Sequence, residues 1–296
     1  MQEIIDRGPF FFMRQGGFAA LLLAAVFLSQ GCASLVIPPM VGPVVKNLNR
    51  QADLELVCDG APSYLLLLDS LLISDPDNAR LLLHGAQAYT AYASLMPECG
   101  RPERAAVLGA RAKEYGLRLL GTNKGLAAAA RMPLAGFSEA LQPVGSGEVG
   151  KLFWGGYGWA TWIGFSKGAP AAVADLPKVE QLMLRVLALD ETFYHGGAHL
   201  FLGIYHGSRP VMLGGRPEVS RGHFERALVL GDRRFLPALV AYAEYYARQT
   251  LDRELYVRLL EEALAFDLAL APDLTLPNVL ARRRAQKLLA QVEDFF

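Results

Sequence analysis

The sequence has no surplus of charge of either sign and very little cysteine. Its 296 residues contain 29 Lys and Arg against 29 Asp and Glu, so the formal net charge is zero. Without a positive excess the chain has no general attraction for a phosphate backbone, which excludes non-specific nucleic-acid binding. Hydrophobic residues make up 52% of the chain, far more than disordered segments contain. The composition therefore predicts a folded protein with a sizeable core.

Motifs for catalysis or metal binding are also missing. His195 and His199 have the i, i+4 spacing of a metal-binding pair, but no Glu stands between them, and His206 lies about 10 Å further along the helix axis. Residues 145–150 match GxGxxG, but no strand precedes them and no sheet is predicted around them. No nucleophile elbow and no CxxC pair is present. We therefore predict no enzymatic activity, no metal and no cofactor.

An apolar run near the N-terminus predicts export. Arg14 precedes the run, which covers residues 18–28. The run is too short for a stable transmembrane helix, because about 20 apolar residues are needed to cross a bilayer. We predict that residues 1–31 form a signal peptide and that Met13 is the true start.

The signal ends in Gly31-Cys32, which resembles the cleavage site of a bacterial lipoprotein. Leu usually stands three residues before such a cysteine, whereas here Leu28 stands four before it. We predict that palmitate-type acyl chains on Cys32 form a stable membrane anchor, with residues 32–43 as a proline-containing tether. Ala33 replaces the acidic residue that commonly retains lipoproteins at the inner membrane, which favours the outer membrane. An ordinary secreted protein cleaved nearby is the alternative.

Two further cysteines, Cys58 and Cys99, are expected to pair. In an exported protein two leftover thiols form a disulfide by default. Cys58 precedes one predicted helix and Cys99 follows the next, and an antiparallel hairpin brings these two ends together. Two buried free thiols are the alternative.

The mature chain reads as helical throughout. Apolar residues recur at spacings of three and four, and no run of alternating polar and apolar residues predicts a strand. We predict an all-α fold with a single helical domain over residues 44–296, in which short loops make neighbouring helices antiparallel. The predicted helices are residues 44–57, 62–73, 78–95, 102–120, 147–165, 175–189, 192–207, 217–230, 235–250, 252–266 and 275–296.

These helices contain a weak internal repeat. The tetratricopeptide pattern places small or apolar residues at the first, fifth and eighth positions of each second helix. Each such hairpin buries its apolar face against its neighbours, so we predict a degenerate tetratricopeptide-like array, an α-solenoid. The triplets that fit are Tyr64/Leu68/Leu71, Ala105/Gly109/Ala112, Val179/Met183/Val186, Ser220/Phe224/Ala227 and Tyr256/Leu260/Ala263.

Residues 153–165 interrupt the repeats and contain all three tryptophans. Gly156, Ala160 and Gly164 share a helix face, which predicts the close approach of another backbone along that face. Each helical glycine costs about 1 kcal/mol relative to Ala, so close packing or a ligand cleft must compensate. The segment is therefore either a central core helix or the wall of an apolar cavity or pore.

Five blocks in the C-terminal part resemble the T-component family of tripartite ATP-independent periplasmic (TRAP) transporters. The resemblance implies a periplasmic lipoprotein of tetratricopeptide-like helices that forms a homotrimer with a pore or cavity through each protomer. It also implies association with the substrate-binding P-component, without chemistry of its own. The blocks are residues 199–205 (HLFLGIY), 209–215 (RPVMLGG), 223–228 (HFERAL), 245–252 (YYARQTLD) and 276–285 (LPNVLARRRA).

On this resemblance the chain is expected to be an accessory component of TRAP uptake. It would bind the P-component and help capture or transfer a small hydrophobic or organic-acid ligand through an apolar pore. The alternative function is a tetratricopeptide scaffold lipoprotein for envelope assembly, with a polar peptide groove and no small ligand. From residue type and placement, the residues nominated to line the cavity are Trp154, Tyr157, Trp159, Trp162 and Tyr205.

Overall fold

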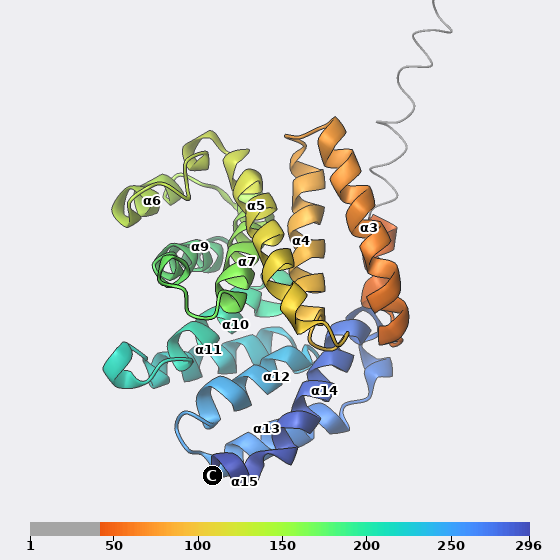
Figure 1. Cartoon of the computed structure of the whole chain (residues 1–296). Helices are drawn as coiled ribbons and strands as arrows, with labels where there is room; N and C mark the ends of the chain where they lie inside the picture. Colours follow the sequence, from red (N-terminus) through yellow and green to blue (C-terminus); the bar gives the residue numbers. More distant parts are fainter. Residues whose placement is uncertain (1–41) are drawn as a thin grey trace, which may run out of the picture. The chain divides into compact units, whose positions relative to one another are not determined.

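The computed structural model describes residues 42–296, and this part of the chain consists of helices and loops without strands (Figure 1). The predicted all-α class is confirmed. Residues 45–296 form one compact unit. The predicted signal peptide, the start at Met13 and the lipidation site Cys32 lie outside the described residues.

The helices pack around two hydrophobic cores, and α10 contributes side chains to both. Figure 1 shows α3, α4, α5 and α7 side by side, in agreement with their contacts. The first core is built mainly by α3 (Leu54–Ser74), α4 (Ala79–Leu95), α5 (Ala105–Gly121), α6 (Leu134–Leu141), α7 (Val149–Phe165), α8 (Pro170–Val173) and α9 (Leu176–Leu189). The second is built mainly by α10 (Phe193–Gly207), α11 (Pro217–Leu230), α12 (Leu236–Tyr242), α13 (Arg253–Ala265), α14 (Thr275–Ala290) and α15 (Val292–Phe295).

The predicted repeat positions are core positions. Every member of the five triplets except Leu71 is buried, as expected when each hairpin covers its apolar face with its neighbours. The structure differs from the prediction by adding α6 between α5 and α7. It also replaces the second half of the predicted helix 235–250 with a π-helical turn, Ala243–Ala247, and ends the last long helix at Ala290.

The predicted break before Pro62 is wrong, because α3 runs through this residue without interruption. Proline lacks the N–H that would bond the carbonyl four residues earlier, which belongs to Cys58. That carbonyl instead accepts a hydrogen bond from the Tyr92 hydroxyl of α4, at 2.9 Å. The Tyr92 hydroxyl therefore replaces the lost hydrogen bond and offsets this part of the cost of proline inside a helix.

Cys58 thus lies inside α3 rather than before a helix. The structure joins it in a disulfide to Cys99, with the Cα atoms 5.8 Å apart. Since Cys99 follows the end of α4, the bond ties the start of α3 to the end of α4.

The backbones of α5 and α7 approach closely along a line of small residues. A Cβ atom at Gly158 would lie 2.6 Å from the carbonyl oxygen of Ala112, and one at Gly116 would lie 2.8 Å from the carbonyl oxygen of Gly155. Only glycine fits at these contacts, because real Cβ atoms do not come so close to a backbone. The glycines of α7 are therefore compensated by tight helix packing.

The predicted ridge of Gly156, Ala160 and Gly164 is not the face of this approach. Gly156 faces the side chains of Leu182 and Met183 on α9, and a Cβ at Gly164 would meet nothing within 4 Å. The prediction identified the correct helix and the wrong face.

The outward face of α3 is unusually apolar. Leu66 is 67% exposed and Ile73 is 80% exposed. By length and composition α3 could cross a membrane, but Leu68 and Leu72 are buried in the first core. That packing is typical of the core helix of a folded domain.

Candidate functional site

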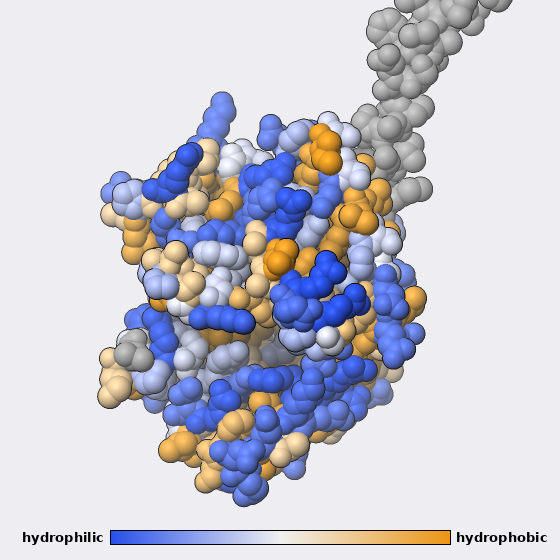
Figure 2. Space-filling view, in the orientation of Figure 1, coloured by the Kyte–Doolittle hydropathy of each residue, from blue (hydrophilic) through white to orange (hydrophobic). Residues whose placement is uncertain are grey.

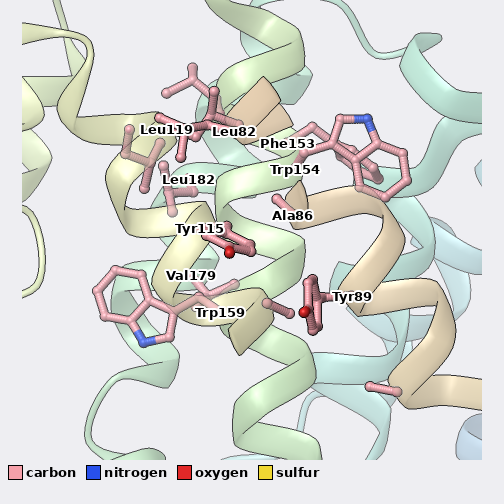
Figure 3. Close-up of a cluster of buried hydrophobic side chains, with 14 of the residues drawn as sticks. Leu82, Ala86, Tyr89, Tyr115, Leu119, Phe153, Trp154, Trp159, Val179 and Leu182 are labelled. Carbon is pink, nitrogen blue, oxygen red and sulfur yellow. The ribbon is translucent and has the colours of Figure 1, made fainter. Parts of the chain in front are cut away.

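The structure separates the five nominated aromatic residues. Trp154 and Tyr157 contact each other, with ring centroids 5.9 Å apart. Figure 3 shows Trp154 and Trp159 projecting from opposite sides of α7. Trp162 lies near Trp159, since the Lys113 ammonium contacts both rings. Tyr205 lies on α10 beside Phe201, with ring centroids 6.1 Å apart.

Trp159 and Trp162 serve to hold helices together. Trp159 has no exposed surface, and its indole N–H donates to the Asp175 carboxylate at 2.9 Å. The same carboxylate accepts from the Lys113 ammonium at 3.0 Å, which lies 3.4 Å from the centre of the Trp162 ring. Because a side chain without exposed surface cannot line a cavity, the nomination of Trp159 is wrong.

Tyr205 lies near the C-terminal end of α10. The Arg209 guanidinium lies 4.3 Å from the centre of its ring, and Phe201 stacks on it. None of its aromatic contacts reaches Trp154 or Tyr157.

Trp154 and Tyr157 belong to a larger aromatic group where the two cores meet, here named the junction cluster. Tyr194 packs against both cores. Its ring centroid lies 4.7 Å from that of Trp154 and 5.9 Å from that of Phe235. The cluster consists of Phe153, Trp154, Tyr157, Phe193, Tyr194 and Phe235.

An unusual backbone places Tyr194 in the cluster. Tyr194, His195 and Gly196 all have left-handed φ angles, of 50°, 58° and 72°. Non-glycine residues in this region cost roughly 1–2 kcal/mol each, so the surrounding packing must enforce the turn. Strained backbone of this kind is concentrated at functional sites. Sequence reasoning missed the turn because 192–207 has regular helical spacing, and only the Gly196-Gly197 pair gives a local sign of it.

The tyrosines of the junction cluster are shielded from bulk water. Burial raises the pKa of Tyr157 and that of Tyr194, with the neighbouring Tyr157 hydroxyl as a second cause for Tyr194. Both side chains nevertheless retain partial exposure. Figure 2 shows the surface hollowed between the helices of the first core and the strongly hydrophilic region over α14.

The left-handed turn breaks the i, i+4 helical spacing expected for His195 and His199. His195 stacks on Phe235, with ring centroids 5.4 Å apart, and is separated from the other histidines. His199 Nδ1 and His223 Nδ1 are instead 2.9 Å apart across α10 and α11. Within residues 42–296 no three His, Cys, Asp or Glu side chains are placed to hold a metal ion.

Protonation of His206 and His223 should destabilise the protein at acidic pH. Burial lowers the pKa of His206 and of His223 to about 4, whereas an unfolded histidine titrates near pH 6.5. Since the unfolded chain then binds protons first, the free energy of unfolding should fall as the pH drops from about 6.5 to 4. We expect a loss on the order of 2 kcal/mol between pH 7 and pH 5, measured by urea titration. A His206→Gln/His223→Gln variant should show a flatter pH profile, and equal profiles would refute this origin.

The fold is a set of packed helical hairpins, and the comparisons identify the family. The family model of the TRAP transporter T-component matches residues 50–296. The chain therefore belongs to this family, which places it among the accessory components of TRAP transport. Membership implies association with other TRAP components and a periplasmic or membrane-associated location.

A protein of Treponema pallidum (strain Nichols) is also similar to this chain. The two are 25% identical over 265 residues, which cover 83% of this chain and 81% of the relative. The relative is described as an uncharacterized protein, so it adds no function of its own.

Proposed function

We propose that this T-component binds the periplasmic P-component of a TRAP system and helps it capture or release a small, largely apolar ligand. Membership of the T-component family over residues 50–296 supports the P-component as the binding partner. The proposed ligand site rests on the junction cluster. There, six aromatic rings from α7, α10 and the loop before α12 meet between the two cores.

The junction cluster suits such a ligand in two respects. Small-molecule sites are mostly apolar and aromatic, contain few polar groups, and occur preferentially between packed units. The tight α5–α7 contact and the left-handed turn at Tyr194 hold two sides of the cluster rigid. A preorganised site loses less conformational entropy when it binds.

We further propose that the mature protein is a homotrimeric lipoprotein, anchored through Cys32 and facing the periplasm from the outer membrane. The exposed apolar side chains of α3, among them Leu66 and Ile73, support self-association. The mass of the N-terminal peptide of the mature protein tests the anchor. An unmodified Cys32, or cleavage at another position, would contradict it.

Native mass spectrometry of the protein purified from its own cell envelope tests the ligand site. We expect a small-molecule adduct on the wild-type chain. Trp154→Leu should reduce its occupancy roughly fivefold, since the lost aromatic contact is worth about 1 kcal/mol. Tyr205→Phe, outside the cluster, should leave the occupancy unchanged. Equal losses in the two variants, or no adduct on the wild type, would contradict a ligand in the junction cluster.

A further inference from the structure

The left-handed turn of α10 needs support from other parts of the chain. Tyr194 and His195 are its two non-glycine residues, and such residues keep a left-handed conformation only where surrounding contacts enforce it. The N–H of Gly196 donates to the Thr192 carbonyl oxygen at 3.4 Å, which is a long and weak hydrogen bond. The turn is therefore not held by its own backbone alone.

Glu191, just before the turn, is bound from two sides. Its carboxylate forms a bidentate pair with the Arg226 guanidinium of α11, with Arg226 Nε 3.0 Å from Oε2. Oε2 also lies 3.3 Å from Nε2 of His199, which follows the turn on α10. The bond to Arg226, followed by the bond to His199, lowers the pKa of Glu191 to about 2, so the carboxylate is charged at neutral pH. One carboxylate thus bridges the turn and joins it to α11.

His199 is itself fixed by α11. Its Nδ1 lies 2.9 Å from Nδ1 of His223, and burial lowers its pKa, which keeps the ring neutral at pH 7. Because a carboxylate only accepts hydrogen bonds, the neutral ring carries its hydrogen on Nε2 and accepts from His223 at Nδ1. His223 and Arg226 are three residues apart on α11 and share one face of that helix. The four residues Glu191, His199, His223 and Arg226 are here named the turn clamp.

The turn places two rings in or beside the junction cluster. The Tyr194 ring centroid lies 4.7 Å from that of Trp154, and His195 stacks on Phe235 at 5.4 Å. With helical φ angles in place of the left-handed ones, both rings would leave these positions, because φ sets the direction of the side chain.

We propose that the turn clamp holds the left-handed turn and thereby positions Tyr194 in the proposed ligand site. Glu191 and Arg226 are positioning residues in this proposal. It rests on the proposed ligand site and adds the residues that keep one of its walls in place.

The effect of the clamp is expected to be local. The side chains of Arg226 and Glu191 are 43% and 40% exposed, and exposed ion pairs contribute little to global stability. Local opening of a strained turn is more sensitive, because its free energy is smaller than that of global unfolding. The experiment must therefore measure the turn itself.

Hydrogen exchange of the full mature chain, followed by mass spectrometry, measures opening of the turn. Arg226→Gln should speed exchange of the amides of residues 192–197 about tenfold, since a charge-assisted bidentate contact shifts the opening equilibrium by roughly that factor. Arg226→Lys keeps the charge and loses the bidentate geometry, so it should give a smaller increase. The midpoint of urea unfolding should move little in either variant.

Arg221→Gln is the matched control. Arg221 lies on the same helix and pairs with Glu225 at 2.8 Å, and these side chains are similarly exposed. Their pair joins two residues of α11 instead of joining α11 to the turn. Arg221→Gln should therefore exchange as the wild type does.

The ligand site supplies a second readout. In native mass spectrometry, Arg226→Gln should carry the small-molecule adduct at roughly fivefold lower occupancy than the wild type, because the displaced Tyr194 ring no longer contacts the ligand. Arg221→Gln should keep the occupancy of the wild type.

Unchanged exchange in Arg226→Gln, or an equal increase in Arg221→Gln, would overturn the proposal. Faster exchange with unchanged adduct occupancy would also overturn it, since the turn would then be irrelevant to the ligand. A wild type without any adduct would contradict the proposed ligand site instead. The exchange measurement needs no ligand, so the two failures are distinguishable.

Discussion

Replacing Cys58 and Cys99 by serine should lower the free energy of unfolding by about 4 kcal/mol. The cross-link closes a loop of 41 residues, and the chain-entropy model assigns a loss of this size to opening such a loop. It also fastens the start of α3 to the end of α4, where α3 has an exposed outer face and is covered on one side only.

Urea unfolding of the oxidised wild type and of the double serine variant measures the difference. Adding a thiol reductant provides the control. The reductant should lower the stability of the wild type towards that of the variant and leave the variant unchanged. A wild type that is insensitive to reductant would show that the two thiols are not joined.

Gly158→Ala should destabilise the protein by about 2–3 kcal/mol, the upper part of the range for overpacked cores. The new methyl group would lie 2.6 Å from the Ala112 carbonyl oxygen. Because that atom belongs to the backbone of α5, the strain cannot be relieved by rotating a side chain. The helices must separate, which would also displace Tyr157, the residue before Gly158 on α7.

Gly164→Ala is the matched control on the same helix. A Cβ there meets nothing within 4 Å, so the substitution should stabilise the protein by about 0.5–1 kcal/mol through helix propensity. Chemical denaturation of the two variants should therefore give opposite signs. If both were stabilised equally, the close α5–α7 approach would be refuted.

Helical periodicity predicted the fold well because it depends on local spacing. Leu68, Ala112 and Leu260 were identified as repeat positions, and all three are fully buried. Where α3 continues through Pro62, the freed Cys58 carbonyl is satisfied by the Tyr92 hydroxyl, which is 30 residues beyond Pro62 along the chain. No local pattern contains that contact, so the predicted break was a reasonable error.

The candidate site was predictable only in part. Trp154 and Tyr157 were found because an aromatic helix with several glycines is unusual. Helical spacing already separates Trp159 from Trp154 by about 140° around α7, but it could not show that Asp175 pairs with Trp159. Tyr194 was missed because its position depends on a left-handed turn that only tertiary packing supports.

Chemical crosslinking in the source cell, followed by capture of the tagged mature protein and mass spectrometry, tests the proposed role in TRAP transport most directly. We expect enrichment of a TRAP-type substrate-binding protein, together with crosslinks between copies of the chain at the mass of a trimer. Enrichment of envelope-assembly factors without any substrate-binding protein would contradict it and favour the scaffold function instead.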